Sequence, residues 1–306
     1  MHTYAASIAV RILTVASCKG NRLGGDSSVA SDAAARLPGE PRRGKTMGAD
    51  WLLPIYGLIV GMLVGLTGMG GGVLMTPLLV LGLGMPATAA IGTDLAYSSI
   101  TKLAGTWQHW RQGTVDMRVV RALATGSVPA TLVAVATLFF LQSVDATAVD
   151  ALLERFIGVM LVVAATLMLR KLWHSTRGTA ESLPEHLVIH PTGKLVAIGA
   201  LGGFLVGLTS IGSGSLIIAL LVITVSLTPD KLVGTDVAHA FLLVGVAALA
   251  HLFVLRDVDV VLAGKLLIGS IPGVLIGSRL TVWVPRRPLQ AGLVVLLLTT
   301  AVSLLR

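Results

Sequence analysis

The sequence predicts an all-α polytopic membrane protein made of two related halves, and three observations support this fold class. Hydrophobic residues make up 54% of the 306 residues, whereas charged residues make up only 12%. A soluble domain carries about 25% charged residues, because its surface faces water. Several apolar runs reach about 18 residues, the length at which a helix crosses the hydrocarbon core of a bilayer. The third observation is an internal repeat at a shift of 142 residues.

The first 46 residues differ from the rest of the chain, and no function is predicted for them. They hold seven basic and three acidic residues, a balance of +4 out of the formal net charge of +8. Their apolar stretch, residues 5–16, is interrupted by Arg11 and is too short to span a bilayer. Three interpretations stay open: a disordered tail, a targeting segment, or a reading frame that begins too early, with Met47 as the true start.

Several motifs of the first half recur, in the same order, in the second half. Chance seldom gives a series of ordered matches at nearly one shift, so the sequence indicates an internal duplication. The matching pairs are Gly61–Thr67 with Gly203–Thr209, Gly92–Asp94 with Gly234–Asp236, and Gly126–Pro129 with Gly269–Pro272.

Each half contains five apolar segments, of which the second is short and follows a cluster of glycine or serine. Because five is odd, the second half is predicted to be an inverted repeat of the first, with about eight to ten transmembrane helices in total. The total is a range because the short segments can cross the bilayer or re-enter it. The expected segments are 51–68, 72–84, 88–109, 118–141 and 151–170, then 194–211, 214–228, 232–254, 259–283 and 288–305.

The predicted organisation is a tail over 1–46, a first transmembrane repeat over 51–171, a cytoplasmic linker over 172–193 and a second repeat over 194–305. Arginine and lysine gather in alternate connections, and such connections stay on the cytoplasmic side of a membrane. The bias predicts a multi-pass membrane protein whose first segment begins outside, and the location expected for it is the bacterial inner membrane, as the family resemblance given below implies. The basic charge thus reflects topology, and because no Lys/Arg run is interleaved with aromatic residues, no nucleic acid is expected as a partner.

Two Gly/Ser clusters, residues 67–72 and 209–215, are candidates for a substrate site. Glycine costs a helix about 1 kcal/mol per residue against alanine, so the helices are expected to break there. Helices break at membrane depth where they face protein or a wet cavity, and the N–H groups at a helix start bind anions. Close packing of small residues is the alternative explanation. The predicted substrate-binding residues are Thr67, Gly70, Gly71, Gly72, Thr93, Lys102, Thr209, Ser210, Ser213, Gly214 and Thr235.

Three further ionisable residues, Asp94, Asp236 and His239, are predicted to act in ion coupling or in helix capping. Each aspartate follows Gly-Thr at the start of an apolar segment, where it would complement the helix dipole. A carboxylate at membrane depth is costly, however, and therefore also marks an ion or proton site. Lys102 lies eight residues after Asp94, so it either pairs with a carboxylate or faces a cavity and attracts anions.

No enzymatic activity, cofactor or metal site is expected from the motifs. The single cysteine, Cys18, excludes an internal disulfide framework and a multi-cysteine metal site. The sequence contains no Gly-x-x-x-x-Gly-Lys-[Ser/Thr], no His-Glu-x-x-His and no Gly-x-Ser-x-Gly. ATP-driven transport would therefore need another subunit, and nothing indicates a hydrolase.

Residues 65–72, followed by Thr76-Pro77 and then by Gly92-Thr93-Asp94, resemble a motif of the bacterial TauE/SafE (sulfite exporter) family. The resemblance extends over about residues 51–305. It implies duplicated modules with Gly-rich repeats, and transport of anions such as sulfite, sulfoacetate or related sulfonates. The chain departs from the family pattern at Asp94, where asparagine often stands.

Together these features predict a secondary transporter that moves a small anion, such as sulfite, a sulfonate or another sulfur-containing organic anion, across the inner membrane. The expected partners are this anion and the lipid bilayer, with proton coupling left open. Two alternatives from other classes also stay open. One is a passive anion channel, and the other is a membrane subunit or scaffold for a partner enzyme.

Overall fold

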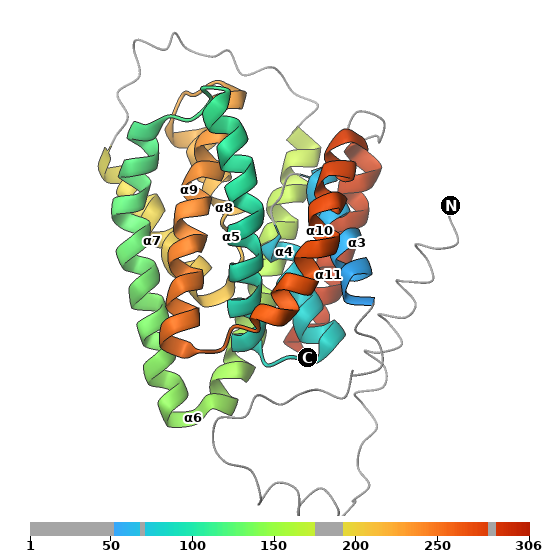
Figure 1. The fold of residues 1–306 in the computed structure, drawn as a ribbon. Helices are drawn as coiled ribbons and strands as arrows, with labels where there is room; N and C mark the ends of the chain where they lie inside the picture. Colours follow the sequence, from blue (N-terminus) through green and yellow to red (C-terminus); the bar gives the residue numbers. More distant parts are fainter. Residues whose placement is uncertain (1–51, 68–70, 175–191, 281–285) are drawn as a thin grey trace, which may run out of the picture.

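The computed structural model describes residues 52–67, 71–174, 192–280 and 286–306, and every regular element in these ranges is helical (Figure 1). The predicted all-α polytopic membrane fold is thereby confirmed. The predicted tail and most of the predicted linker lie outside these ranges. The elements are α3 (Leu52–Thr67), α4 (Gly72–Pro77), η1 (Leu78–Gly82), α5 (Ala87–Arg111), α6 (Met117–His174), α7 (Thr192–Thr209), α8 (Ser215–Thr224), α9 (Pro229–Ala250), η3 (His251–Leu255), α10 (Val260–Leu280) and α11 (Arg286–Leu305).

Among the residues that the structure describes, five helical stretches are long and apolar enough to cross a membrane, and the double-length α6 is one of them. The apolar α3 and the α4–η1 unit are shorter. Large apolar side chains also cover the outside of the bundle: Phe140, Phe253 and Ile268 are each about two-thirds exposed. A surface of this kind is stable against lipid chains and unstable against water. The protein is therefore a multi-pass membrane protein.

The connection predicted between the fourth and fifth segments, residues 142–150, is shorter than expected. Helix α6 reverses its direction around Asp145, whose φ of −154° and ψ of 98° are not helical (Figure 1). The Asp145 carboxylate accepts hydrogen bonds from the backbone N–H groups of Thr147 and Ala148, both at 3.0 Å. An aspartate in this position caps a helix start. The fourth and fifth segments thus form a helical hairpin, whose first arm is 117–144 and whose second arm is 146–174.

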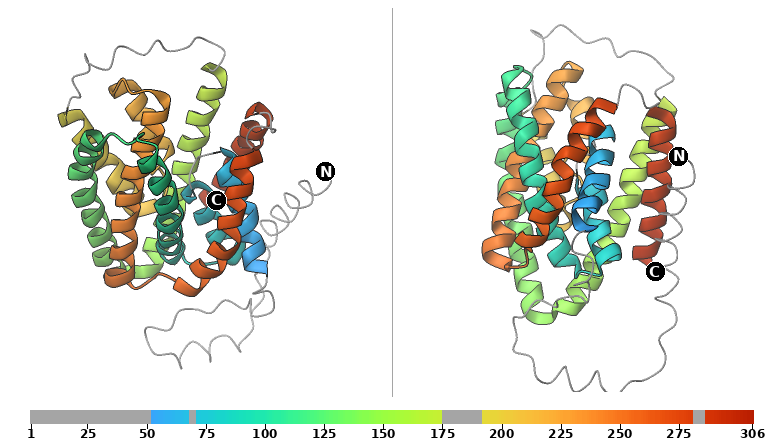
Figure 2. Two further views of the ribbon diagram at one scale, coloured as in Figure 1. Left: turned by 45° about the horizontal axis from the view of Figure 1, so that its top comes forward. Right: turned by 45° about the vertical axis from the view of Figure 1, so that its right-hand side comes forward.

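The helices of the two halves pack against each other in a reciprocal pattern. The first helix of each half contacts the fourth of the other half: α3 lies on α10, and α7 lies on the first arm of α6. The third helices, α5 and α9, lie side by side, and α11 lies along the second arm of α6 (Figure 2). A two-fold symmetry axis between the halves would produce this reciprocal packing. The inverted orientation of the halves itself stays a prediction.

Glycine permits the close approach of α3 and α10. A Cβ atom on Gly61 would overlap the backbone of Ser270, and a Cβ atom on Gly269 would overlap the carbonyl oxygen of Pro54. The same arrangement recurs between α7 and α6, where Gly203 lies against Ser127. Small residues let transmembrane helices approach until their backbones touch. The repeated glycines Gly61 and Gly203 therefore serve helix packing.

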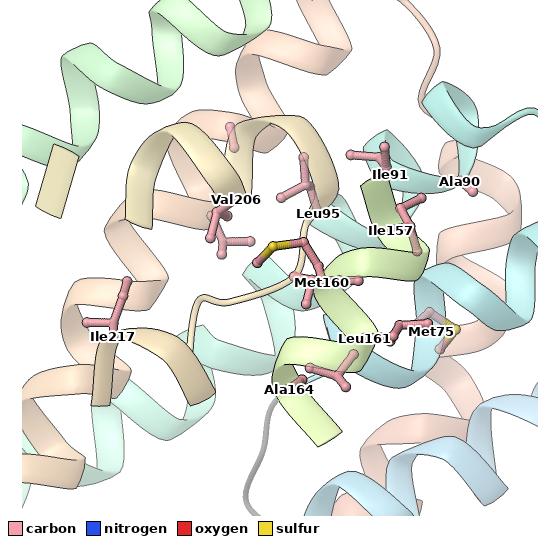
Figure 3. Close-up of a cluster of buried hydrophobic side chains, with 14 of the residues drawn as sticks. Met75, Ala90, Ile91, Leu95, Ile157, Met160, Leu161, Ala164, Val206 and Ile217 are labelled. Carbon is pink, nitrogen blue, oxygen red and sulfur yellow. The ribbon is translucent and has the colours of Figure 1, made fainter. Parts of the chain in front are cut away.

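The second arm of α6 occupies the middle of the apolar core (Figure 3). Its fully buried Ile157 and Leu161 lie among side chains of α4 and α5, and its Met160 is nearly buried. Val206 of α7 and Ile217 of α8 complete the cluster on the other side. The core thus joins the short helices α4 and α8 to the long helices around them, and it fixes both Gly/Ser clusters relative to α5.

Candidate functional site

Asp94 lies at the centre of a buried cluster of hydroxyl groups. Its side chain is fully buried, and its carboxylate accepts hydrogen bonds from Thr76 Oγ1 at 2.6 Å and from Ser210 Oγ at 2.7 Å. Ser98, one turn later in α5, donates a third bond at 3.1 Å. These donors come from α4, from the connection after α7 and from α5. Asp94 therefore ties both short-helix regions to α5.

The second Gly/Ser cluster breaks the helix as predicted. α7 ends at Thr209, and Ser210 then adopts a left-handed conformation with φ of 59°, as does Gly212 with φ of 110°. The Thr209 hydroxyl accepts the N–H of Ile211 at 3.2 Å, which satisfies one backbone group of the break. α8 then begins at Ser215, and no side chain caps it at Gly214. The start of α8 thus presents N–H groups without a side-chain cap, which is the feature that attracts anions at helix starts.

The first Gly cluster meets the second one directly. Gly71 and Gly72 are buried at the start of α4, and a Cβ atom on Gly72 would overlap the carbonyl oxygen of Ser210. The same Cβ atom would stand 3.2 Å from Asp94 Oδ2. Gly70 and the side chain of Thr67 lie outside the described residues. Where the structure describes them, the two breaks predicted from the sequence are therefore in contact with each other and with Asp94.

Lys102 places a positive charge beside this cluster. Its Nζ atom donates a hydrogen bond to Ser213 Oγ, two residues before the start of α8. The ammonium group also interacts electrostatically with Asp94 and Asp236. Lys102 thus lies near both carboxylates and contacts the broken segment, whereas pairing with a carboxylate and facing a cavity both stay predictions. The arrangement offers an anion a cation, a hydroxyl and a helix start at one place.

Asp236 and His239 lie together on α9, three residues apart and on one face. Asp236 Oδ1 and His239 Nδ1 are buried and have no hydrogen-bond partner among the described residues. His239 Nε2 lies 2.9 Å from Ser127 Oγ of the first arm of α6. The corresponding residue of the first half, Tyr97, forms a hydrogen bond with Ser270 of α10. The pair Asp236–His239 is thus a second polar group beside Lys102, and unlike Asp94 it is incompletely bonded.

Thr93 and Thr235, both predicted to contact substrate, make reciprocal bonds at helix starts. Thr93 Oγ1 accepts the N–H of Asp259 at 3.0 Å, just before α10. Thr235 Oγ1 accepts the N–H of Asp116 at 2.9 Å, just before α6. Each hydroxyl hydrogen can still be donated, so contact with substrate stays a prediction for these two residues. The structure does not bring them into the bonds around Asp94 and Lys102.

Neither Asp94 nor Asp236 lies at a helix start, so helix capping, one of the two roles predicted for them, does not apply. α5 begins at Ala87 after Pro86, and α9 begins at Pro229, so each aspartate lies about two turns inside its helix. The predicted segments begin at 88 and 232, one and three residues after these starts, and extended backbone at Pro86 and Thr228 precedes each helix. The helix dipole acts mainly in the first turn. The two carboxylates are therefore interior polar groups.

Four residues of this region were not predicted as site residues: Thr76, Ser98, Ser127 and Ser270. Thr76 stands in the Thr-Pro pair after the first glycine cluster, and Ser98 lies four residues after Asp94 on one helical face. Ser127 and Ser270 occupy the same place in the repeated Gly-Ser-x-Pro motif. Their recurrence was visible, but their partners, Tyr97 and His239, lie on other helices. The described residues contain no cluster of three histidine, cysteine or acidic side chains that could hold a metal ion.

Tyr97→Phe is expected to lower stability by about 1 kcal/mol, because it removes one buried hydrogen bond, to Ser270. The measurement is thermal unfolding in detergent micelles. Tyr56→Phe is the matched control, since Tyr56 on α3 is 42% exposed. Equal melting temperatures for the two variants would contradict a stabilising role for the Tyr97–Ser270 bond.

Residues 53–304 match the model of a protein family described as the sulfite exporter TauE/SafE. Among curated proteins of Bacillus subtilis (strain 168), the chain is 39% identical to the probable membrane transporter protein YjnA over 251 residues, which is 82% of this chain and 98% of that protein. It is 27% identical to the probable membrane transporter protein YdhB over 245 residues, 79% of this chain and 94% of that protein. No solved structure matches the chain.

Proposed function

The chain belongs to the sulfite exporter TauE/SafE family, and we propose that it is a secondary transporter for a small sulfur-containing oxyanion in the bacterial inner membrane. The curated relatives carry names that describe probable membrane transporters. The substrate class proposed is sulfite or a short sulfonate. These anions share a compact group of oxygens that accept hydrogen bonds, and the polar cluster around Lys102 supplies donors of the matching kind.

The observation that carries the proposal is the contact between Lys102 and Ser213 immediately before α8. A lysine in a transmembrane bundle is costly unless it pairs with an opposite charge or lines a polar pathway. The N–H groups at the start of α8 have no side-chain cap and add their partial positive charge at the same place. An anion that displaces Ser213 from Lys102 would contact the ammonium group, the serine hydroxyl and the helix start together.

The described conformation is closed around this position. Ser210 and Ser213 are 1% and 5% exposed, and Asp94 is fully buried. Lys102 is partly exposed, but an anion can contact Ser210 and Ser213 as well only when the segments around the two breaks separate. Secondary transporters with inverted repeats achieve this by moving one group of helices against the other around a central site. The reciprocal packing of the two halves supports such a movement for this chain.

Lys102→Ala is expected to lower the initial uptake rate by about 30-fold or more, since loss of a buried charge contact costs about 2–5 kcal/mol. Proteoliposomes containing the full chain are loaded with buffer, and uptake of radiolabelled sulfite and of methanesulfonate is followed over time. Lys194→Ala is the matched control, because Lys194 is exposed in the first turn of α7. Its uptake rate should equal that of the unchanged protein.

The same assay separates the other function classes. A passive channel would give flux that rises linearly with anion concentration and does not saturate. A scaffold subunit would give no flux for any anion from well-folded protein. Saturable uptake that is unchanged in Lys102→Ala would support the transport function and contradict the proposed substrate site at Lys102.

A further inference from the structure

The two repeated aspartates, Asp94 and Asp236, differ in their hydrogen bonding. Asp94 accepts three hydroxyl hydrogen bonds, whereas Asp236 is only 4% exposed and its Oδ1 atom has no partner among the described residues. A carboxylate can only accept hydrogen bonds, but a protonated carboxyl group also donates one. These hydrogen bonds therefore stabilise Asp94 in its ionised, carboxylate form. Asp236 gains a hydrogen-bond donor if it takes up a proton.

His239 offers an acceptor for that donor. It lies one helical turn after Asp236 on the same face of α9, and its buried Nδ1 atom also lacks a partner. Ser127 holds the other ring nitrogen at 2.9 Å. When Nε2 donates to Ser127, Nδ1 is an acceptor. The two unpartnered atoms do not bond each other in the described conformation, so an O–H on Asp236 reaches Nδ1 only after its side chain turns toward His239.

The charge balance around Lys102 points to the same proton. Lys102 interacts with both aspartates, so the three groups carry a net charge of −1 when all of them are ionised (one cation and two carboxylates). An entering anion adds a second uncompensated negative charge, and buried charge of this kind is strongly unfavourable. A proton on Asp236 offsets the charge of the anion one for one.

Other titratable groups on the helices around α9 have their own partners or lie elsewhere. The carboxylate of Asp116, just before α6, accepts the N–H groups of Arg118 and Val119, and His251 of η3 lies 3.2 Å from Asp257. Lys194 is exposed in the first turn of α7, and α8 has no titratable side chain. The charged group that acts on Asp236 is Lys102, which also interacts with Asp94.

We propose that the anion and a proton bind together, the anion at Lys102 and Ser213 and the proton at Asp236, which makes the protein a proton–anion cotransporter. The proposal rests on the proposed function, which it extends by naming the coupling ion and its carrier. Asp94 remains the fixed carboxylate that positions the two breaks. The two repeated aspartates thus have different roles: Asp94 positions the breaks, and Asp236 carries the proton.

The test uses proteoliposomes with a pH gradient of one unit, acidic outside, and with the membrane potential clamped to zero. Methanesulfonate is the probe, because its sulfonate stays ionised and carries no proton of its own. The unchanged protein should accumulate the probe about tenfold inside, since one pH unit equals a factor of ten for a one-to-one carrier. Asp236→Asn should only equalise the concentrations. Asp230→Asn is the matched control, an exposed carboxylate in the first turn of the same helix, and should accumulate the probe normally.

The outcomes separate this inference from the proposed function. Flux of methanesulfonate or sulfite without accumulation by the unchanged protein would overturn the cotransport of a proton and leave the transporter standing. No flux of either probe would overturn both. Accumulation that persists in Asp236→Asn would show that another residue carries the proton, and would overturn the assignment to Asp236.

A binding measurement covers the case in which Asp236→Asn folds but does not transport. Methanesulfonate is added to protein in weakly buffered micelles that contain a pH-sensitive dye. The unchanged protein should take up about one proton per bound anion, and Asp236→Asn should take up none, because binding is linked to protonation of that residue. Equal proton uptake by the two proteins would overturn the inference.

Discussion

Asp94→Ala is expected to abolish anion uptake and to lower the stability of the folded protein by about 3–5 kcal/mol, because several buried hydroxyl groups lose a charged acceptor. This loss follows from its hydrogen bonds, because the substitution leaves the buried hydroxyls of Thr76, Ser98 and Ser210 without their common acceptor, at about 1–3 kcal/mol each. The substitution also removes a carboxylate that interacts with Lys102. The two breaks would then lose the group that holds them together.

Uptake into proteoliposomes and thermal unfolding in micelles measure the two effects separately. Asp94→Asn keeps one carbonyl oxygen as an acceptor, so it should retain most of the stability while it loses the negative charge. Asp230→Ala is the control for loss of an exposed carboxylate. If Asp94→Ala and the unchanged protein had equal melting temperatures, the hydroxyls would have found other partners. Asp94 would then not organise the breaks.

Gly269→Ala and Gly264→Ala should change stability in opposite directions, although both lie in α10. A Cβ atom at position 269 overlaps the carbonyl oxygen of Pro54 in α3, so the two helices must separate. Overpacking of this kind typically costs about 1–3 kcal/mol. A Cβ atom at position 264 meets nothing within 4 Å, and alanine is the better helix former by about 1 kcal/mol.

Melting temperatures in one detergent give the comparison directly, and gel filtration confirms that each variant is folded. Gly269→Ala should melt below the unchanged protein, and Gly264→Ala should melt at or above it. Equal effects of the two substitutions would contradict the backbone contact between α3 and α10 as the reason for glycine at position 269.

Most of the helices could be predicted from the sequence, because apolar runs of membrane-spanning length are a direct signal. All ten predicted segments coincide with helical regions, within the residues that the structure describes. Helix boundaries were less accurate. The starts of α5 and α9 lie at Pro86–Ala87 and Thr228–Pro229, before the apolar runs, and the hairpin at Asp145 needs no loop because a single aspartate caps its second arm.

The site was predicted in part. Asp94, Lys102, Ser210 and Ser213 come together as expected for residues at broken helices, and Gly72 lies against them. What the sequence could not show is which helix faces which, since Thr76 reaches Asp94 across 18 residues and Ser210 reaches it across 116. Nor could spacing reveal that Thr93 and Thr235 bond to the starts of α10 and α6. Such contacts depend on the packing of distant segments, which hydrophobic periodicity does not encode.

The pairing of α3 with α10 also sets an order of events during synthesis. Gly61 emerges from the ribosome 209 residues before its neighbour Ser270. At about 5–20 residues per second, α3 stands in the membrane for roughly 10–40 s before its partner exists. During that interval its groove of glycines, which approaches another backbone in the finished protein, is open to lipid or to other nascent helices. Neither half can therefore mature alone, and the insertion machinery must shelter the first helix until the ninth predicted segment has been made.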